Sequence, residues 1–357
     1  MSVIIGWKTI QWSYTLAKLT MADVANRAGV GIATVDRVLN GRRKVREETA
    51  RRVYEAALEL GYHSTPVIRY RLEGERPQMS FGFVLPKEHQ PFYQQLSRDL
   101  RDAVENHSSV RGRARFFFAE SQSPVEHSDL ILRAADAVDV IAASVVTHPK
   151  VSQAAGEARA ADKPVFAILN DFAPNVCQGY VGLDNYRAGR VAGWLLTNAI
   201  RRTGSVAVLV GGNLWQGHQL RESGLRAFFR ENNVPLQIRD TVLNVETRKV
   251  TYEVMHNMLT TWDDLCGLYV TGGGAEGVLD ALREVTTPHP IKVIAHVLND
   301  ELRAALADNR LTAVIRTPTQ ELAKSVVEQM VQTKFDPSTH RTDQTILRPE
   351  IVLPEYL

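Results

Sequence analysis

Seven basic side chains crowd into a short stretch near the amino-terminal end of the chain. Between residues 37 and 52 only Glu47 and Glu48 oppose them, so the local net charge is 7 minus 2, or +5, whereas the whole chain carries +2. Concentrated positive charge of this kind neutralises phosphate groups, which indicates that one module contacts nucleic acid. The alternative is a solvated helical bundle that contacts other proteins. The basic residues are Arg37, Arg42, Arg43, Lys44, Arg46, Arg51 and Arg52.

The residues before this cluster predict a short helix. Thr20 and Asp23 fit a capping box, in which a hydroxyl and a carboxylate satisfy the free backbone N–H groups at a helix start. A helix should therefore begin at Met21. Gly29 should end it, because glycine accepts the left-handed backbone of a tight turn. The apolar face of this helix would consist of Val24, Ala25 and Ala28.

Two more helices should follow after short connections. The second, about residues 32–39, has apolar residues at helical spacing for burial, namely Val35, Val38 and Leu39. In helix-turn-helix docking, the outward positions near the start of such a helix meet base edges. Here those positions are Ile32, Ala33, Thr34 and Arg37. The third helix, about residues 47–60, should bury Val53, Ala57 and Leu60.

This segment resembles the amino-terminal domain of the LacI family of bacterial transcriptional regulators. The matching residues are Thr20, Asp23 to Ala25, Ala28 to Val30, Thr34, Val35, Arg37 to Asn40 and Val45. The resemblance implies operator DNA as partner, with base contacts from Ile32, Ala33 and Arg37 and phosphate contacts from Thr20, Thr34 and Asn40. We assign Arg43 and Lys44 to phosphate anchoring as well. Arg37 is the strongest candidate, since a guanidinium can form two hydrogen bonds with guanine.

The segment departs from the family pattern at two positions where serine is usual. Gly31 stands at the start of the second helix, where glycine can still serve as an N-cap. Asp36 would repel a phosphate, so it either forms an ion pair with a neighbouring arginine or accepts a hydrogen bond from cytosine. We favour the ion pair.

The connector, residues 63–78, is the second departure. The family usually has a hinge helix here, whose leucine wedges into the minor groove. Pro66 could open such a helix, and Ile68 or Leu72 could be the wedge. The run from Arg69 to Arg71 does not match the usual small residues, so a plain basic linker is an equal alternative.

From residue 79 onward, apolar runs alternate with amphipathic segments, which is typical of a doubly wound parallel sheet. The family resemblance implies a two-lobed, type I periplasmic-binding-protein-like α/β domain, with three strands crossing between the lobes. Ligands bind between such lobes, at the carboxyl ends of strands. The runs are SFGFVL, ARFFFA, DVIAASV, PVFAIL, YVGL, SVAVLV, LCGLYV, IKVIAHV and TAVI.

The predicted cleft ligand is a small carbohydrate or polyol. Such a ligand needs amide, carboxylate or guanidinium groups for its hydroxyls and an apolar face for its ring. An anionic ligand is the alternative, because Arg221, Arg316 and the backbone N–H groups of residues 271–274 would favour one. The candidate residues, placed by strand ends and by the resemblance, are Phe92, Tyr93, Asn170, Asp171, Asp184, Arg221, His296, Asn299 and Arg316.

A rival hypothesis from another class is a dinucleotide-binding enzyme. The motif G-x-G-x-x-G is formed by Gly272, Gly274 and Gly277, between a predicted strand and a predicted helix. The dinucleotide-binding pattern also requires an acidic residue that binds the ribose hydroxyl, and His296 occupies that position here. A solute-binding protein that has lost specific DNA reading is a further alternative. We expect a regulator that is not an enzyme and that has no cofactor or metal.

The composition favours a modular cytoplasmic protein. The two cysteines, Cys177 and Cys266, lie in apolar stretches of the sequence, and two free thiols are compatible with a reducing compartment. Residues 1–18 lack a signal-peptide or membrane-span pattern, and we interpret them as a poorly ordered extension; docking of Trp7 and Trp12 on a partner is the alternative. The expected domains are the helix-turn-helix at 19–62, the linker at 63–78, and the effector-binding and dimerisation domain at 79–357, with lobe 1 at about 79–182 and 318–340 and lobe 2 at about 183–315 and 341–357.

A homodimer is expected, because one helix-turn-helix reads too few bases and two copies read paired half-sites of a pseudo-palindromic operator. The carboxyl-terminal text TILRPEIVLPEYL should finish on a strand. No leucine heptads follow it, which predicts a dimer without a tetramer-forming tail.

Two substitutions separate base reading from phosphate anchoring. Arg37→Ala should cost about 1–3 kcal/mol of operator binding and relax specificity at one base position. Arg43→Ala should instead weaken all DNA sequences alike and reduce the salt dependence of binding. Fluorescence-anisotropy titrations at several salt concentrations would measure both effects, and equal losses on specific and non-specific DNA for Arg37→Ala would contradict the assignment.

Overall fold

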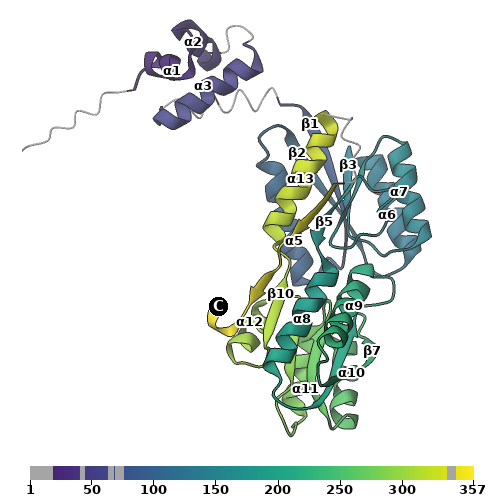
Figure 1. The fold of residues 1–357 in the computed structure, drawn as a ribbon. Helices are drawn as coiled ribbons and strands as arrows, with labels where there is room; N and C mark the ends of the chain where they lie inside the picture. Colours follow the sequence, from purple (N-terminus) through teal and green to yellow (C-terminus); the bar gives the residue numbers. More distant parts are fainter. Residues whose placement is uncertain (1–18, 41–44, 63–67, 69–75, 336–342) are drawn as a thin grey trace, which may run out of the picture. The chain divides into compact units, whose positions relative to one another are not determined.

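A computed structural model describes residues 19–40, 45–62, 68, 76–335 and 343–357. The chain divides into two units, residues 1–77 and 78–357. In its described part the first unit forms helices α1 (Met21–Ala28), α2 (Ile32–Asn40) and α3 (Glu47–Leu60) (Figure 1). These bounds confirm the three predicted helices.

Local signals place the first helix as predicted. The Asp23 N–H donates to Thr20 Oγ1 at 3.4 Å, and the Thr20 N–H donates to Asp23 Oδ2 at 2.8 Å, so the capping box is formed. Gly29 follows α1 with φ of 65°, a left-handed conformation in which glycine has no steric penalty.

The core of the first unit corrects one prediction. Val24, Val35 and Val53 are fully buried in it, and so is Ile68. Ile68 therefore packs among the helices of its own unit and does not present an exposed wedge for the minor groove. Leu72, the other candidate wedge, lies outside the described residues.

The second unit is built on two six-stranded sheets. In the first sheet the order is β11 (Asp343–Leu347), β5 (Gly179–Leu183), β4 (Val165–Ile168), β3 (Val140–Ala143), β1 (Gln78–Pro86) and β2 (Arg111–Ala119). In the second it is β12 (Glu350–Val352), β10 (Ala313–Arg316), β9 (Lys292–Ala295), β8 (Leu265–Val270), β6 (Gly204–Val210) and β7 (Leu236–Leu243). The described pairings are parallel except that of β10 with β12.

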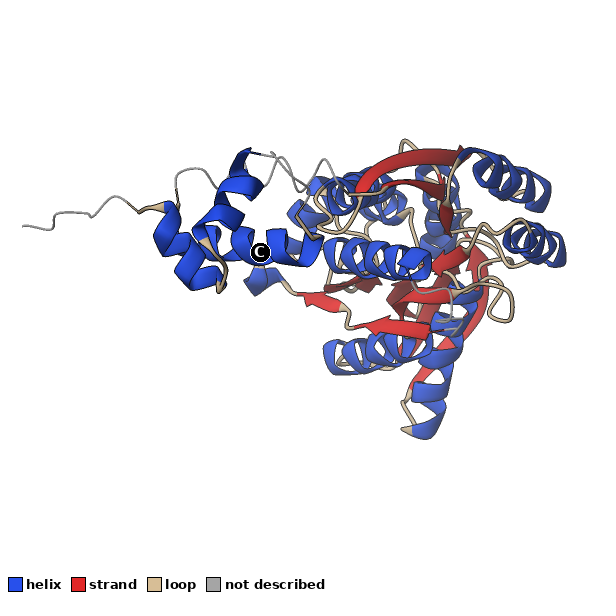
Figure 2. Cartoon of the chain, turned by 90° about the horizontal axis from the view of Figure 1, so that it is seen from above, coloured by secondary structure: helices blue, strands red, loops and turns tan. Residues whose placement is uncertain are grey.

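Helices cover both faces of each sheet, so each lobe has two layers of hydrophobic core (Figures 1 and 2). On the first sheet, α5 (Pro91–Glu105) and α13 (Thr319–Phe335) lie on one face, and α6 (Pro124–Ala137) and α7 (Pro149–Ala160) on the other. On the second sheet, α8 (Asn185–Ala199) and α9 (Gln216–Glu231) lie opposite α10 (Arg248–Thr261), α11 (Ala275–Glu284) and α12 (Asp300–Ala307). This is the doubly wound, two-lobed arrangement that the sequence predicts.

The chain crosses between the lobes after β5, after β10 and after β11. The last crossing corrects the predicted boundary, because β11 pairs with β5 in the first sheet and residues 343–347 therefore belong to lobe 1. The described chain also ends on a short 3₁₀ helix, Pro354–Tyr356, rather than on a strand.

The apolar runs predicted nine strands, and each corresponds to one. Three strands lie outside these runs. Two of them, β11 and β12, fall in or beside the carboxyl-terminal segment that was expected to finish on a strand. The third, β7, was missed; it is an edge strand with the sequence LQIRDTVL and is only partly buried. A strand with little apolar surface to bury carries a weak hydrophobic signal. Because β7 was not predicted, the loop that follows it was not considered as a source of cleft residues.

Helices α8 and α9 approach closely through glycine. A Cβ on Gly224 would stand 2.0 Å from the Tyr186 carbonyl oxygen, and one on Gly189 would stand 1.9 Å from that of Arg221. Only a hydrogen fits at either place, so this pair of glycines fixes the position of α9 and of the Arg221 side chain that it carries.

We expect Gly224→Ala to lower the free energy of unfolding by about 1–3 kcal/mol, because the added methyl group forces two packed helices apart. Gly156→Ala is the matched control, since it also lies within a helix and its nearest neighbour would be Val176 Cγ1 at 3.8 Å. The control should be neutral or gain up to about 1 kcal/mol. Urea unfolding of both variants tests this, and equal stability would argue against the close approach.

Candidate functional site

The start of α2 presents an exposed face in the first unit. Ile32 is 52% exposed, Ala33 and Arg37 are exposed, and Thr34 is half-buried. The opposite face of α2 buries Val35 and Val38 in the core. The residues predicted to contact bases therefore lie on the exposed face of α2, and the buried opposite face anchors the helix in the core.

Among the basic side chains of this stretch that the structure describes, Arg51 and Arg52 have partners within the protein. Arg52 Nη2 donates to the carbonyl oxygens of Ala28 at 2.6 Å and Gly29 at 3.3 Å, where it satisfies the carboxyl-terminal end of α1. Arg51 forms an ion pair with Glu47 at 3.5 Å. Arg52 is thus a structural residue, which the charge count alone does not distinguish from a phosphate-binding one.

The structure describes only some of the side chains that were predicted to contact phosphate. The Thr20 hydroxyl donates to Asp23 Oδ2 at 2.7 Å, so its proton is used inside the capping box rather than being free for a phosphate. The side chain of Asn40 and the whole of Arg43 and Lys44 lie outside the described residues. Asp36 is half-buried.

A cavity of about 70 Å³ lies between the two lobes of the second unit. Its lining is mixed, with aromatic rings and neutral polar groups from both lobes and charged groups from lobe 2. The lining residues are Gln90, Phe92, Tyr93, Ser144, Leu169, Asn170, Trp215, Gly217, His218, Arg221, Glu246, Gly272, Gly273, His296, Val297 and Thr317. Five of the nine predicted ligand residues are among them: Phe92, Tyr93, Asn170, Arg221 and His296.

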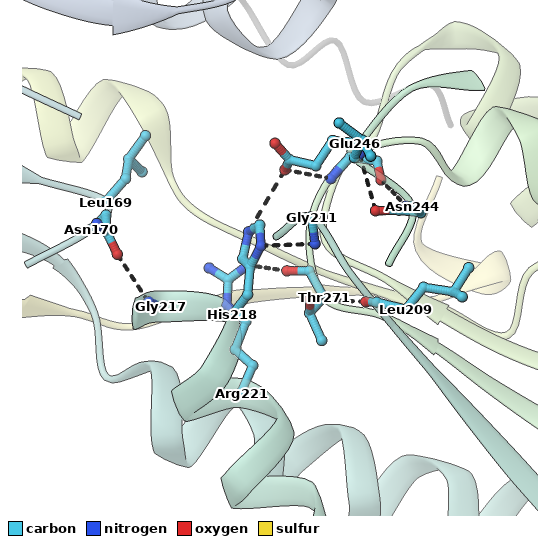
Figure 3. Close-up of polar contacts among 12 residues, drawn as sticks. Leu169, Asn170, Leu209, Gly211, Gly217, His218, Arg221, Asn244, Glu246 and Thr271 are labelled. Carbon is cyan, nitrogen blue, oxygen red and sulfur yellow. Dashed lines mark hydrogen bonds and ion pairs between the residues drawn. The ribbon is translucent and has the colours of Figure 1, made fainter. Parts of the chain in front are cut away.

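Arg221 is a buried cation held by neutral acceptors (Figure 3). Its Nε donates to Asn185 Oδ1 at 2.8 Å and its Nη1 to the Thr271 carbonyl oxygen at 2.5 Å. Burial lowers its pKa from the usual value. The two hydrogen bonds fix the guanidinium plane at the cavity wall.

Glu246 is the main residue that the sequence did not reveal. It follows β7, is 7% exposed and accepts the Gly273 N–H at 3.0 Å through Oε1. Its Oε2 accepts from Lys87 Nζ at 3.0 Å. Burial acts to raise its pKa, but His218, Lys87 and the Gly273 N–H outweigh that effect and lower the pKa to about 2. The missed strand β7 was the signal that would have drawn attention to it.

His218 is oriented by a backbone hydrogen bond. The Gly211 N–H donates to Nδ1 at 3.2 Å, so Nε2 carries the proton of the neutral ring (Figure 3). Nε2 lies 3.6 Å from Glu246 Oε1, which is too far for a hydrogen bond. Burial lowers the pKa of His218 to about 4, so the ring is neutral near pH 7.

Aromatic, amide and imidazole groups also line the cavity. The Phe92 and Tyr93 rings pack edge to face with centroids 5.1 Å apart. Asn170 Oδ1 accepts the Gly217 N–H at 2.9 Å, which joins lobe 1 to lobe 2. His296 Nε2 lies 2.7 Å from the Tyr269 hydroxyl oxygen.

Four predicted ligand residues do not line this cavity, although Asn299 and Arg316 line a neighbouring cavity of about 830 Å³ that shares Phe92, His296 and Thr317 with it. Asp184 caps α8 by accepting the Arg187 N–H, and Asn299 caps α12 by accepting the Leu302 N–H. Arg316 pairs with Glu350 of the antiparallel strand β12. Asp171 is half-buried, and burial raises its pKa. Caps and edge-strand pairs of this kind follow strand ends too, so position along the chain did not separate them from cleft residues.

The glycine-rich loop has a packing explanation. A Cβ on Gly272 would meet Glu246 Oε1 at 2.4 Å, and one on Gly277 would meet the Arg248 carbonyl oxygen at 2.2 Å. Gly274 has φ of 93° where α11 begins. The Gly273 N–H, which was expected to face the ligand, is used by Glu246. The G-x-G-x-x-G spacing thus arises from three separate contacts and not from a phosphate cradle.

Within the described ranges, no helix is long and apolar enough to cross a membrane. The same residues contain no group of three or more His, Cys, Asp or Glu side chains that could hold a metal ion. Cys177 and Cys266 are both free and buried.

Family models match both units of the chain. The model "Bacterial regulatory proteins, lacI family" matches residues 20–65, and "Periplasmic binding protein domain" matches residues 81–334. The chain is 27% identical over 236 residues to the HTH-type transcriptional regulator DegA of Bacillus subtilis, covering 65% of this chain and 66% of DegA. It is 30% identical over 186 residues to the sucrose operon repressor of Streptococcus mutans, covering 51% of this chain and 52% of the repressor. Each match spans less than two thirds of the relative.

Solved structures share the fold of the second unit. GanP, a glucose-galactose binding protein from Geobacillus stearothermophilus, aligns with a TM-score of 0.68 over 78% of this chain and 99% of GanP. The identity is 22%, so this likeness concerns the fold alone.

The pKa of His218 makes stability depend on pH. The unfolded chain takes up a proton near pH 6.5 and the folded ring only near pH 4, so stability is full above pH 6.5 and falls as the pH drops towards 4. We expect His218→Gln to remove about 2 kcal/mol of the loss between pH 7 and pH 5.

Urea unfolding of both proteins at the two pH values measures this difference. Glu246 does not contribute over this interval, because its carboxylate loses stability only below about pH 4.5. An unchanged difference between pH 7 and pH 5 in the variant would show that His218 does not resist protonation.

Proposed function

Because this chain belongs to the lacI family of bacterial regulatory proteins, we propose that it is a DNA-binding transcriptional repressor whose operator affinity is set by a small ligand bound between its two lobes. The exposed amino-terminal face of α2 is the observation that carries the proposal. The names of DegA and the sucrose operon repressor support the regulatory role.

Base reading is assigned to Ile32, Ala33 and Arg37. Ile32 offers an apolar contact to a thymine methyl group, and Arg37 offers a forked donor to guanine. Phosphate contacts are assigned to the half-buried Thr34 of α2 and to the exposed Arg46, which directly precedes α3. Packing of Val35 and Val38 fixes the helix, so the reading side chains need no other support.

The effector is assigned to the neutral polyhydroxy class. Arg316 does not line the 70 Å³ cavity and is paired with Glu350, whose carboxylate offsets the positive charge that would favour an anion. Glu246 brings a carboxylate into the cavity, and Arg221 is already bonded to neutral acceptors. Carboxylate, amide and guanidinium groups beside Phe92 suit hydroxyls and a ring face. The sucrose named for one relative and the glucose and galactose named for GanP fall in the same class.

Ligand binding and DNA binding are coupled through the two lobes. A ligand that changes the separation of the lobes changes the spacing of two amino-terminal units in a homodimer, and DNA binding changes ligand affinity by the same factor. A coupling of about 1–3 kcal/mol alters affinity roughly 5- to 150-fold. The dimer supplies the paired half-sites that one helix-turn-helix lacks.

Selection of genomic fragments tests the regulator directly. The purified protein would be mixed with sheared genomic DNA of the source organism at physiological salt, and the retained fragments would be sequenced. We expect a short inverted repeat, and we expect Arg37→Ala to lose it because base contacts specify the sequence.

Arg27→Ala is the matched control. Arg27 is an exposed arginine of α1 that pairs with Glu59, so its loss should leave the retained repeat unchanged. Retention of no shared sequence by the wild type would instead favour a solute-binding protein that has lost specific DNA reading.

A further inference from the structure

Three arginines follow one face of β2, the strand at the edge of the first sheet. Arg111, Arg113 and Arg115 are exposed, and their spacing of two residues places them on the same side of the strand. Phe117 continues that side into the hydrophobic core that α6 and α7 cover. The exposed half of the strand therefore carries arginines whose Cα atoms are about 6.6 Å apart, and we call these three residues the arginine row.

No acidic residue near it in the sequence balances the charge of the arginine row. Residues 106–119 contain no Asp or Glu, so the net charge of this segment is +3, whereas the whole chain carries +2. The ion pairs that the described residues of lobe 1 form use Lys87 and His107 as cations, not these arginines. On the other side of β2, the guanidinium of Arg101 lies 5.0 Å from the centroid of the Phe116 ring. This edge of the sheet is therefore cationic on both faces.

The residue type and the spacing indicate what such an edge contacts. Charged side chains also protect an edge strand from pairing with another chain, and lysine is the usual residue for that role. Arginine instead has planar, forked donors that match the oxygens of a phosphate in pairs. The spacing of the arginine row is comparable to that of successive phosphates along one DNA strand. These features favour a polymer of regularly spaced phosphates over simple protection of the edge.

The arginine row begins where the chain enters the second unit. Arg111 is the register partner of Gln78, which is the first residue of β1 and of that unit. Ile68 is buried in the core of the first unit, so only residues 69–77 connect that core to β1. A connection of this length spans at most about 30 Å even when it is fully extended. DNA bound by the first unit is therefore presented to the second unit at a high effective concentration.

We propose that the arginine row is a second, sequence-independent DNA contact, in which the effector-binding unit binds phosphates of the duplex that the first unit reads. This inference rests on the proposed function, because that function supplies the DNA. Phosphate contacts raise the affinity for every DNA sequence alike, and they make binding more dependent on salt because each neutralised phosphate releases counterions. The choice of sequence stays with α2 of the first unit.

The salt dependence of DNA binding tests the arginine row without knowledge of the operator. The purified protein and its variant Arg111→Gln/Arg113→Gln/Arg115→Gln would be titrated against a fluorescein-labelled duplex of about 30 bp and arbitrary sequence, at salt concentrations from about 50 to 200 mM. Three phosphate contacts per chain contribute about 2.7 to the slope of log K against log salt concentration. Over this range the wild type should therefore lose roughly 40 times more affinity than the variant.

Arg201→Gln/Arg230→Gln/Arg303→Gln is the matched control. These three arginines are exposed and lie on separate segments of lobe 2, so their substitution removes the same charge without touching β2. This variant should keep the wild-type slope.

The variant Arg111→Lys/Arg113→Lys/Arg115→Lys separates charge from damage to the strand. It keeps three positive charges on β2, and the slope counts neutralised phosphates, so this variant should keep the wild-type slope too. Its affinity should be lower at every salt concentration, because lysine lacks the forked donors of arginine.

Three results would overturn the proposal. The first is an equal slope for the wild type and the glutamine variant, and the second is an equally reduced slope for the lobe 2 control. The third is a glutamine variant that loses binding to a labelled polyglutamate peptide but not to DNA, which would assign the arginine row to an acidic protein partner. Should the glutamine variant fail to fold, judged by circular dichroism, the single variant Arg113→Gln decides, with an expected fall in slope of about 0.9.

Failure of this inference is distinguishable from failure of the proposed function. A wild-type protein that binds no duplex at all contradicts both. A protein that binds DNA and selects a repeat, with the same slope in the wild type and the glutamine variant, contradicts only the contact by the arginine row.

Discussion

A buried carboxylate requires positive charge or hydrogen-bond donors around it, and Glu246 imposes that requirement on the cleft of this protein. Its partners come from both lobes: Lys87 from the first, Gly273 and His218 from the second. Much of the cleft is arranged to satisfy this one group. The glycines at 211 and 272 leave it space, and the left-handed backbone at 245 and 246 aims it across the interface.

Glycine sets the distances on which this arrangement rests. The close approach of α8 and α9 at Gly189 and Gly224 brings Arg221 to the cavity wall, where it meets Asn185 and the Thr271 carbonyl. Gly277 allows α10 and α11 to touch in the same way. Backbone contacts of this kind leave little freedom, so they hold the polar groups of these helices in fixed positions.

In the first unit, side chains also stabilise the ends of its short helices. Three short helices bury few residues, and their ends are secured by side chains: Thr20 and Asp23 at the start of α1, and Arg52 at its end. One arginine of a strongly basic stretch therefore serves the fold. The exposed start of α2 can then carry Ile32 and Arg37 on a rigid support.

The sequence by itself determined the three helices, nine of the strands and the family, because caps, apolar periodicity and short motifs are local signals. It also placed five residues at the cavity, among them Arg221 and Asn170. Only the tertiary structure decided the rest. Glu246 follows a polar edge strand that periodicity does not mark, and its partners Lys87 and Gly273 are far from it along the chain. Asp184, Asn299 and Arg316 also stand at strand and helix ends but do not line the 70 Å³ cavity, and each serves locally as a cap or in an ion pair. Ile68 is buried in the core of its own unit. In each case the partner that a side chain meets depends on packing between segments that are far apart in the sequence, which local sequence signals do not specify.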